Sequence, residues 1–498
     1  MCISAANRHA ALAALVAVML CGCTVGPDFT SPAAPASSGY AQGGDPAVTA
    51  AASGVSQHFP IAASLPPDWW QLFDCAPLNQ AVKEGLKNSP TIMAARAKLR
   101  EADDELRSGE GIFYPQVSAG AAASRQHPSG NATPTGLREG VFNLFTLSAS
   151  VGYALDVFGG ERRTVEALGA QVDFQRNASR AASLSLAANI ANTLIAIAAY
   201  RAEIDATDAI VKTEQSQVRL AHVQAMAGTG TYAAELGLQS QLESTQSTLP
   251  VLEQQLASAQ HLLAVLEGHP PAQRLPVFLD FGAISLPRTI PVSLPSDLVR
   301  QRPDVLQAEA ALHGASAEIG VATAAMFPSF TLDGSVGYSA VSSAGFFSPA
   351  SSAWSIGAGV TQPIFNGGSL HFRKEAAQDA FDAADAQYRL AVLTGFQQVA
   401  DSLRALEHDA QALAVREQAL QTSRRALNLA EANYKAGLSN YSDLLLADAL
   451  VHQAEISQIE TRAQRYQDTV ALFASLGGGW WNAPGGGPQA ASGTGLAN

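Results

Sequence analysis

The chain has 498 residues and a formal net charge of −13 at pH 7 with histidine neutral. Charged residues make up only 15% of it, below the quarter that is usual in soluble domains, so much of its surface is expected to face something other than bulk water. Proteins that bind nucleic acid need a basic stripe, and the acidic balance therefore argues against a nucleic-acid partner.

The first 22 residues have the pattern of a bacterial export signal. Arg8 gives a short positive region, and the apolar stretch 10–20 is too short to cross a bilayer as a helix. Cys23 follows small residues in a pattern that resembles a lipoprotein box, which predicts an acylated, palmitate-bearing Cys23 as the first mature residue. The alternative is cleavage at another small residue, which leaves Cys23 as an ordinary thiol. Thr24 stands where an aspartate would favour retention in the inner membrane, so the outer membrane is favoured.

The segment 23–64 is predicted to be a lipidated N-terminus and linker. From Thr30 onward it is rich in Ala, Ser, Gly and Pro, the composition of a tether or of a strap laid over a surface. Once the signal is removed, only Cys23 and Cys75 remain, which leaves neither a disulfide framework nor a zinc-ligand set. Cys75 is expected to be a small buried apolar residue.

Two halves of the chain repeat each other at an offset of 209 residues. Ala227-Gly228 is matched by Ala436-Gly437, and a ladder of apolar residues spaced by seven precedes each glycine. Its rungs are Ile190, Ile197, Ile204, Val211, Val218 and Ala225 in the first half and Val399, Leu406, Leu413, Leu420, Leu427 and Tyr434 in the second. The predicted division is repeat 1 over 65–268, a connection over 269–295, repeat 2 over 296–477 and a disordered Gly-rich tail over 478–498.

Long helices are predicted in both repeats. The proline-free stretch 161–227 would form a rod of about 100 Å, and 369–436 matches it in length. Each is followed by a turn at the glycine and by a returning helix of about forty residues, so each repeat carries a coiled-coil hairpin. Pro250 should bend or break the first returning helix, because its ring costs about 3 kcal/mol in a helix interior. These helices alone would also fit an elongated cytosolic coiled coil.

Four segments alternate apolar and small polar residues, as strands with two different faces do. They predict β-hairpins at about 114–157 and about 328–364. A soluble sandwich would show the same alternation. A sheet in lipid cannot leave open edges, and bacterial barrels need at least eight strands, so two or three copies would have to share one barrel.

The order of the short motifs resembles the TolC-type outer membrane factor family, in particular its NodT-type efflux lipoproteins. The motifs are Cys23-Thr24-Val25-Gly26-Pro27, Trp69-Trp70, Asn88-Ser89-Pro90, Phe113-Tyr114-Pro115, Asp156-Val157-Phe158-Gly159-Gly160, Arg302-Pro303-Asp304, Phe327-Pro328, Pro363-Ile364-Phe365-Asn366-Gly367-Gly368 and Tyr434-Lys435-Ala436-Gly437 followed by Asp443-Leu444-Leu445. The resemblance extends from Cys23 to about Gly478.

The resemblance implies a homotrimer in which a twelve-stranded outer-membrane β-barrel, four strands per chain, continues into a long periplasmic α-helical barrel. It implies a periplasmic adaptor and an inner-membrane pump of the resistance-nodulation-division type as partners, and passive conduction of drugs or other small solutes. The family's gate lies at the periplasmic tip, to which Gly228, Glu235, Tyr434, Gly437 and Asp443 correspond. Where many members carry a second aspartate three residues after the first, this chain has Leu446, with Asp448 nearby but on a different face, so one carboxylate ring of the gate is open to question.

Two other functions remain open at this point. A duct of a type I protein secretion system would share the fold, and a structural coiled-coil lipoprotein of the outer membrane would use the helices without the hairpins. An enzyme is not expected, because the sequence has no P-loop, no HExxH and no GxSxG motif, and its ten histidines lack ligand spacing. Neither a cofactor nor a metal is expected.

Overall fold

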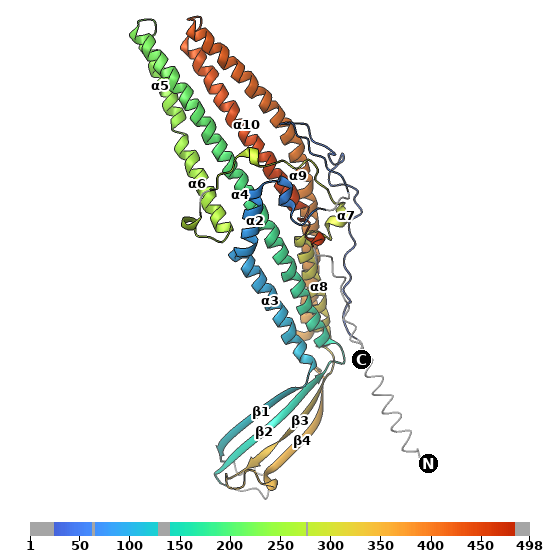
Figure 1. Cartoon of the computed structure of the whole chain (residues 1–498). Helices are drawn as coiled ribbons and strands as arrows, with labels where there is room; N and C mark the ends of the chain where they lie inside the picture. Colours follow the sequence, from blue (N-terminus) through green and yellow to red (C-terminus); the bar gives the residue numbers. More distant parts are fainter. Residues whose placement is uncertain (1–23, 62–64, 128–139, 275–276, 484–498) are drawn as a thin grey trace. The chain divides into compact units, whose positions relative to one another are not determined.

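The computed structural model describes residues 24–61, 65–127, 140–274 and 277–483 (Figure 1). The predicted signal, Cys23 and the end of the predicted tail lie outside these residues. The described residues divide into two compact units, which are described separately: unit 1 takes residues 24–32, 98–127, 140–175 and 308–388, and unit 2 takes 33–61, 65–97, 176–274, 277–307 and 389–483. Both units therefore contain residues of both repeats.

Unit 1 is built on one four-stranded antiparallel sheet in the order β1-β2-β3-β4. The strands are β1 (Gln116–Gln126), β2 (Phe142–Leu155), β3 (Ser329–Ala340) and β4 (Ser352–Thr361). Each predicted hairpin forms, and β2 pairs with β3 along eleven residue pairs, from Phe145 opposite Ala340 to Leu155 opposite Phe330. The two hairpins therefore make a single sheet, whose edge strands are β1 and β4.

The rows of residues that cross the sheet alternate in character. One row joins Val117, Val151, Gly334 and Ile356, and the next joins Ser118, Ser150, Ser335 and Ser355. Because side chains alternate between the two faces of a strand, the apolar row and the serine row lie on opposite faces. The sheet thus has one apolar face and one face of small polar residues, as its sequence pattern predicted.

The two long helices form over the predicted ranges. They are α4 (Gly160–Met226) and α9 (Ser369–Lys435), each of 67 residues, which corresponds to about 100 Å. Two shorter helices begin with proline, whose missing N–H costs nothing at a helix start: α3 (Pro90–Glu110) and α8 (Pro303–Ala324). The short elements are η1 (Trp69–Phe73), α2 (Ala76–Asn88), η2 (Gly111–Phe113), η4 (Pro271–Gln273), η5 (Phe281–Ala283), α7 (Pro295–Leu298), η6 (Pro349–Ser351) and η7 (Trp480–Asn482).

The returning helices differ between the repeats (Figure 1). In the first repeat the path is broken into α5 (Tyr232–Gln246) and α6 (Leu249–Leu266), and Pro250 stands at the start of α6. In the second repeat α10 (Tyr441–Ser475) runs on without a break for 35 residues. The break predicted at Pro250 is confirmed, because proline is tolerated in the first turn of a helix but not in its interior.

An aromatic cluster lies in the core of unit 2. Phe473 on α10 stacks on Trp69 with ring centroids 5.2 Å apart, and Phe73 lies edge-on to Phe473 at 6.0 Å. Phe73 also stacks on Tyr466 at 6.4 Å. Cys75 is a buried free thiol beside this cluster, as expected from the sequence. The cluster joins the start of repeat 1 to the end of repeat 2.

Helix α4 is the one described helix that is long and apolar enough to cross a membrane by length and composition. Half of its most apolar window is buried within the protein. The segment from Leu186 to Ala199 supplies much of the core of unit 2, and Ile190 and Ile197 are completely buried there. Its apolar character is therefore used in packing against other helices of the same chain.

The strap predicted after residue 30 is fixed in unit 2 by a buried arginine. Arg465 of α10 is only 1% exposed, and it donates hydrogen bonds to the carbonyl oxygens of Ala52 and Val55 at 3.3 and 3.1 Å. It also donates to the side chains of Gln57 and Thr49 at 3.2 and 3.3 Å. Four acceptors satisfy this one guanidinium, and the strap is thereby held on α10.

Candidate functional site

The two hairpin tips of unit 2 are built in the same way. Gly228 ends α4 with φ +72° and Gly437 ends α9 with φ +73°, a left-handed conformation that glycine adopts without a Cβ clash. The amide N–H of Leu438 returns to the carbonyl of Asn433 at 2.8 Å, and that of Thr229 returns to the carbonyl of Gln224 at 2.9 Å. The repeat therefore extends to the hydrogen bonds that close each tip.

Each returning helix begins with a side-chain cap. The hydroxyl of Thr231 accepts a hydrogen bond from the N–H of Ala234 at 3.2 Å, and the side chain of Asn440 accepts one from the N–H of Asp443 at 3.1 Å. Such caps satisfy amides that would otherwise have no partner at a helix start. The first turn of α10 therefore places Asp443 at a fixed and exposed position.

Tyr434 joins the two hairpins instead of lying free at the tip. Its side chain is 9% exposed, and its hydroxyl donates a hydrogen bond to Oε1 of Gln224 on α4 at 2.8 Å. Burial raises the pKa of Tyr434, so the phenol stays protonated and remains a donor. Sequence reasoning missed Gln224; a polar residue directly before Ala225, the last rung of the first ladder, was the available signal.

The remaining tip residues separate into buried and exposed positions. A carboxylate oxygen of Glu235 lies 2.9 Å from Nδ1 of His222 of α4, and the side chain of Glu235 is 16% exposed. Leu446 is 63% exposed, whereas Asp448 is 1% exposed. The structure brings Gly228 and Glu235 together on the α4–α5 tip and Tyr434, Gly437 and Asp443 on the α9–α10 tip. It places Asp448 in the interior.

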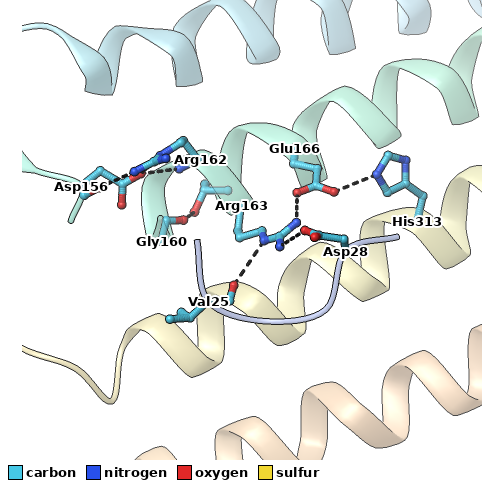
Figure 2. Close-up of polar contacts among 9 residues, drawn as sticks. Val25, Asp28, Asp156, Gly160, Arg162, Arg163, Glu166 and His313 are labelled. Atoms are coloured by element: carbon cyan, nitrogen blue, oxygen red, sulfur yellow. Dashed lines mark hydrogen bonds and ion pairs between the residues drawn. The ribbon is translucent and has the colours of Figure 1, made fainter. Parts of the chain in front are cut away.

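The segment that follows Cys23 is held in unit 1 (Figure 2). Arg163 of α4 has a side chain that is only 6% exposed. Its guanidinium donates to the carbonyl of Val25 at 3.3 Å and to the carboxylates of Asp28 and Glu166 at 2.6 and 2.7 Å. His313 of α8 contacts the other oxygen of Glu166 at 3.0 Å. Arg163 thus holds the N-terminal segment on α4, and Glu166 extends the contact to His313 of α8.

The Asp156-Val157-Phe158-Gly159-Gly160 motif shapes the same region. Asp156 accepts hydrogen bonds from the amides of Glu161 and Arg162 at the start of α4, at 3.1 and 3.0 Å. Gly159 has φ +78°, and a Cβ there would lie 2.7 Å from Cγ2 of Thr24. Gly26 faces Gly320 of α8 so closely that a Cβ on Gly26 would lie 2.5 Å from the Cα of Gly320. The glycines therefore allow the N-terminal segment to approach the helices.

Replacing Arg163 by methionine should release the N-terminal segment. Methionine keeps the aliphatic bulk but loses the three donated hydrogen bonds, so the amides of residues 24–28 should exchange with deuterium several-fold faster. Hydrogen–deuterium exchange mass spectrometry of the full chain measures this directly. Arg162→Met is the matched control, because Arg162 bonds to Asp156 and not to the N-terminal segment. Equal exchange in the two variants would contradict the assignment of this contact.

Among the described residues, no group of three or more His, Cys, Asp or Glu side chains is placed to hold a metal ion.

Comparison with known proteins gives consistent results. The outer membrane efflux protein family matches residues 81–269 and 294–478. The pyoverdine export outer membrane protein OpmQ of Pseudomonas aeruginosa is 30% identical over 421 residues, which cover 83% of this chain and 87% of OpmQ. Nodulation protein T of Rhizobium leguminosarum bv. viciae is 28% identical over 492 residues, which cover 98% of this chain and 97% of that protein. The solved structure of the outer-membrane channel OprN matches with a TM-score of 0.82 and 26% identity, over 92% of this chain and 100% of OprN.

These similarities confirm the predicted fold class, a trimeric outer-membrane β-barrel with four strands per chain continued by an α-helical barrel. The matching family is one of outer membrane efflux proteins and the structural neighbour OprN is an outer-membrane channel, which argues against both an enzyme and a purely structural coiled coil. The roles of Cys23 and of the tip residues stay predictions. The chain belongs to the outer membrane efflux protein family, and it is an outer-membrane efflux channel that extends into the periplasm.

Proposed function

We propose that three copies of this chain form the outer-membrane duct of a tripartite efflux system, which passively conducts drugs or other small solutes from a periplasmic adaptor and an inner-membrane pump of the resistance-nodulation-division type. The observation that carries the proposal is the sheet of unit 1. It has four strands, two edges and two faces of opposite character.

The edges of the sheet require partner subunits in a bilayer. Unpaired backbone groups on β1 and β4 would each cost several kcal/mol in hydrocarbon, so the sheet must be continued by its neighbours. Three sheets of four strands make a closed barrel of ordinary size. The apolar face, which includes Trp354 and Ile356 at 76% and 82% exposure in the single chain, then lies against lipid.

The opposite face supports passage of unrelated solutes. Ser118 and Ser150 are hydrogen-bonded to each other at 2.8 Å, and so are Ser335 and Ser355. In three copies these rows form a belt of serines around the lumen, a surface that is wet and binds no single solute tightly. The relative OpmQ is a pyoverdine export protein, which accords with a duct for small molecules.

The tip of unit 2 is proposed as the gate and as the part next to the adaptor. Asp443 is exposed at the start of α10, so three copies would present one ring of carboxylates, and the exposed Leu446 would add no second ring. Tyr434 of α9 is bonded to Gln224 of α4 and would hold the two hairpins of one chain together, whereas Glu235 of α5 contacts His222 of α4 and would hold the α4–α5 tip closed. Gly228 and Gly437 supply the turns. The energy for transport would come from the pump.

Drug accumulation in cells that lack this protein tests the proposal. Cells without the channel should retain more of a fluorescent drug than wild-type cells, and deleting the partner pump as well should add nothing further. Native mass spectrometry of detergent-extracted protein should give a trimer. A clean monomer would overturn the shared barrel, and unchanged drug levels together with the loss of a secreted protein would identify a secretion duct instead.

Cys23→Ser should remove the lipid anchor. Serine has no thiol for acylation, so the N-terminal peptide should lose the mass of its acyl chains, while the trimer persists because the barrel itself holds it in the membrane. Intact-protein and peptide mass spectrometry measure the acylation, and gel mobility of unheated samples measures the trimer. An N-terminal mass that does not depend on Cys23 would show that the residue carries no lipid.

A further inference from the structure

A group of buried polar side chains lies between the two hairpins of unit 2. Glu214 and Gln217 of α4 are 2% and 7% exposed, and Asp448 of α10 is 1% exposed. Thr245 of α5 donates a hydrogen bond from its hydroxyl to Oε1 of Glu214 at 2.9 Å, and Gln241 donates from its amide at 3.3 Å. Three helices therefore contribute to one buried polar site.

Part of this site has no hydrogen-bond partner among the described residues. The unsatisfied atoms are Oε2 of Glu214, Oδ2 of Asp448, both amide atoms of Gln217 and Nε2 of His452. A buried polar atom without a partner costs about 1–3 kcal/mol, and more if it is charged. Two ionised carboxyl groups side by side in such a place are strongly disfavoured, so the pair should take up a proton.

Burial and the neighbouring acids favour the protonated form of Asp448. Burial first, and then the nearby carboxyl groups of Glu214 and Glu431, raises the pKa of Asp448 to about 7, although the amide of Gln217 acts to lower it. Burial lowers the pKa of His452 although Glu214 and Glu455 oppose this, so a positive charge on the imidazole is disfavoured beside the pair.

The neighbouring acids are themselves paired. Glu431 on α9 lies 3.5 Å from Lys435, and Glu455 on α10 lies 2.7 Å from Arg424. The two cations therefore already have partners of their own. Two side chains of α5 bond to Glu214, and both are uncharged: they are Gln241 and Thr245. A proton is the ligand that fits a site with two carboxyl groups and neutral amide and hydroxyl donors, since no group of three or more His, Cys, Asp or Glu in the described part of the chain is placed to hold a metal ion.

We propose that Glu214 and Asp448 form a buried proton-binding site, and that the shared proton holds the α4–α5 hairpin against the α9–α10 hairpin of the same chain. With the proton bound, one carboxyl group donates to the other and a single negative charge is buried. When it leaves, two carboxylates repel each other between packed helices. Asp448 lies five residues after Asp443 on α10, so loosening at this site acts on the helix that begins at the tip.

The direction of the pH effect follows from the raised pKa of Asp448. The packed state binds the proton more tightly than a separated state does, so the contact is strongest at acidic pH and weakens as the pH rises through about 7. An effect of the proton on conductance rests on the proposed function, whereas the proton-binding site itself does not.

Hydrogen–deuterium exchange of the full-length trimer in detergent tests the site. Wild type and Asp448→Asn are compared at about pH 6 and again at about pH 8.5, so that the intrinsic effect of pH on exchange cancels. Asparagine is nearly isosteric and cannot ionise. Peptides spanning 205–250 and 440–458 should exchange alike at the lower pH, and the wild type should exchange about tenfold faster than the variant at the higher pH. Asp401→Asn, an exposed aspartate on α9, is the matched control and should follow the wild type.

A second measurement covers the case in which Asp448→Asn does not assemble. Infrared difference spectra of the wild-type trimer should show a protonated carboxyl band that decreases as the pH is raised from about 6 to about 8.5, and this decrease should be smaller or shifted in its midpoint in Glu214→Gln. Burial also raises the pKa of Glu203 and of Asp409 to about 7, so the difference between the two proteins is what reports the site. The proposal would be overturned if wild type and Glu214→Gln gave the same spectra, or if wild type and Asp448→Asn exchanged identically at both pH values. If drugs were exported normally but exchange at the tip did not depend on pH, this inference alone would be contradicted. If the proton site were found but the protein exported no drug, only the proposed function would be contradicted.

Discussion

Ile356→Arg should prevent the protein from assembling as a trimer in the outer membrane. Ile356 is 82% exposed in the middle of the apolar face of β4, where the barrel meets lipid. An arginine at the midplane of a membrane β-barrel costs about 2–4 kcal/mol, and the trimer carries it three times. The total is comparable to the stability of a whole domain. Membrane fractionation and the mobility of unheated samples in gels would report the loss of trimer.

Ser355→Arg is the control on the same strand. Ser355 is the neighbouring residue and points to the opposite face, where it bonds to Ser335 in the row that lines the lumen. An arginine there stays in water, so the trimer should form and only conductance should change. Assembly of both variants to the same extent would contradict the assignment of the two faces.

Phe473→Ala should strongly destabilise unit 2. Phe473 is fully buried and packs on Trp69 and Phe73, so removing its ring leaves a cavity that neighbouring helices cannot easily fill. Truncation of a buried phenylalanine costs about 3–5 kcal/mol. Thermal unfolding of the trimer followed by circular dichroism should show a clear fall in the unfolding temperature.

Phe278→Ala gives the comparison for this core substitution. Phe278 is 71% exposed, and the guanidinium of Arg201 lies 4.6 Å from its ring centroid. A contact of this kind at an exposed site contributes about 0.5–1 kcal/mol. Equal effects of the two substitutions would mean that the aromatic cluster is not the core of unit 2.

The sequence was sufficient to predict the long helices and the strands, and to predict which face of each strand is apolar. The seven-residue ladder predicted two long helices, the alternating segments predicted four strands, and Pro250 predicted the break between α5 and α6. These predictions succeeded because periodicity and backbone restrictions are local properties, which a short stretch of sequence expresses by itself. The ordered motifs also carried the family, which the comparisons confirm.

The sequence could not predict which polar residues meet in the fold. The sequence placed Asp448 on a different face from the gate position, yet only the packing of α10 against α4 shows that its carboxyl is buried beside Glu214. Tyr434 contacts Gln224, which is 210 positions away in the sequence, and Arg163 contacts Asp28, which is 135 positions away.

The amino-acid sequence by itself thus determined the repeat, the long helices, the two-faced strands and the family. The tertiary structure alone decided that two hairpins share one sheet, that Arg163 holds the N-terminal segment and that a carboxyl pair is buried between the helical hairpins. The physical reason is that periodicity specifies which face of an element is apolar, but not which distant element covers that face. Pairing of polar groups depends on the position of both partners, and that position exists only once the chain has folded.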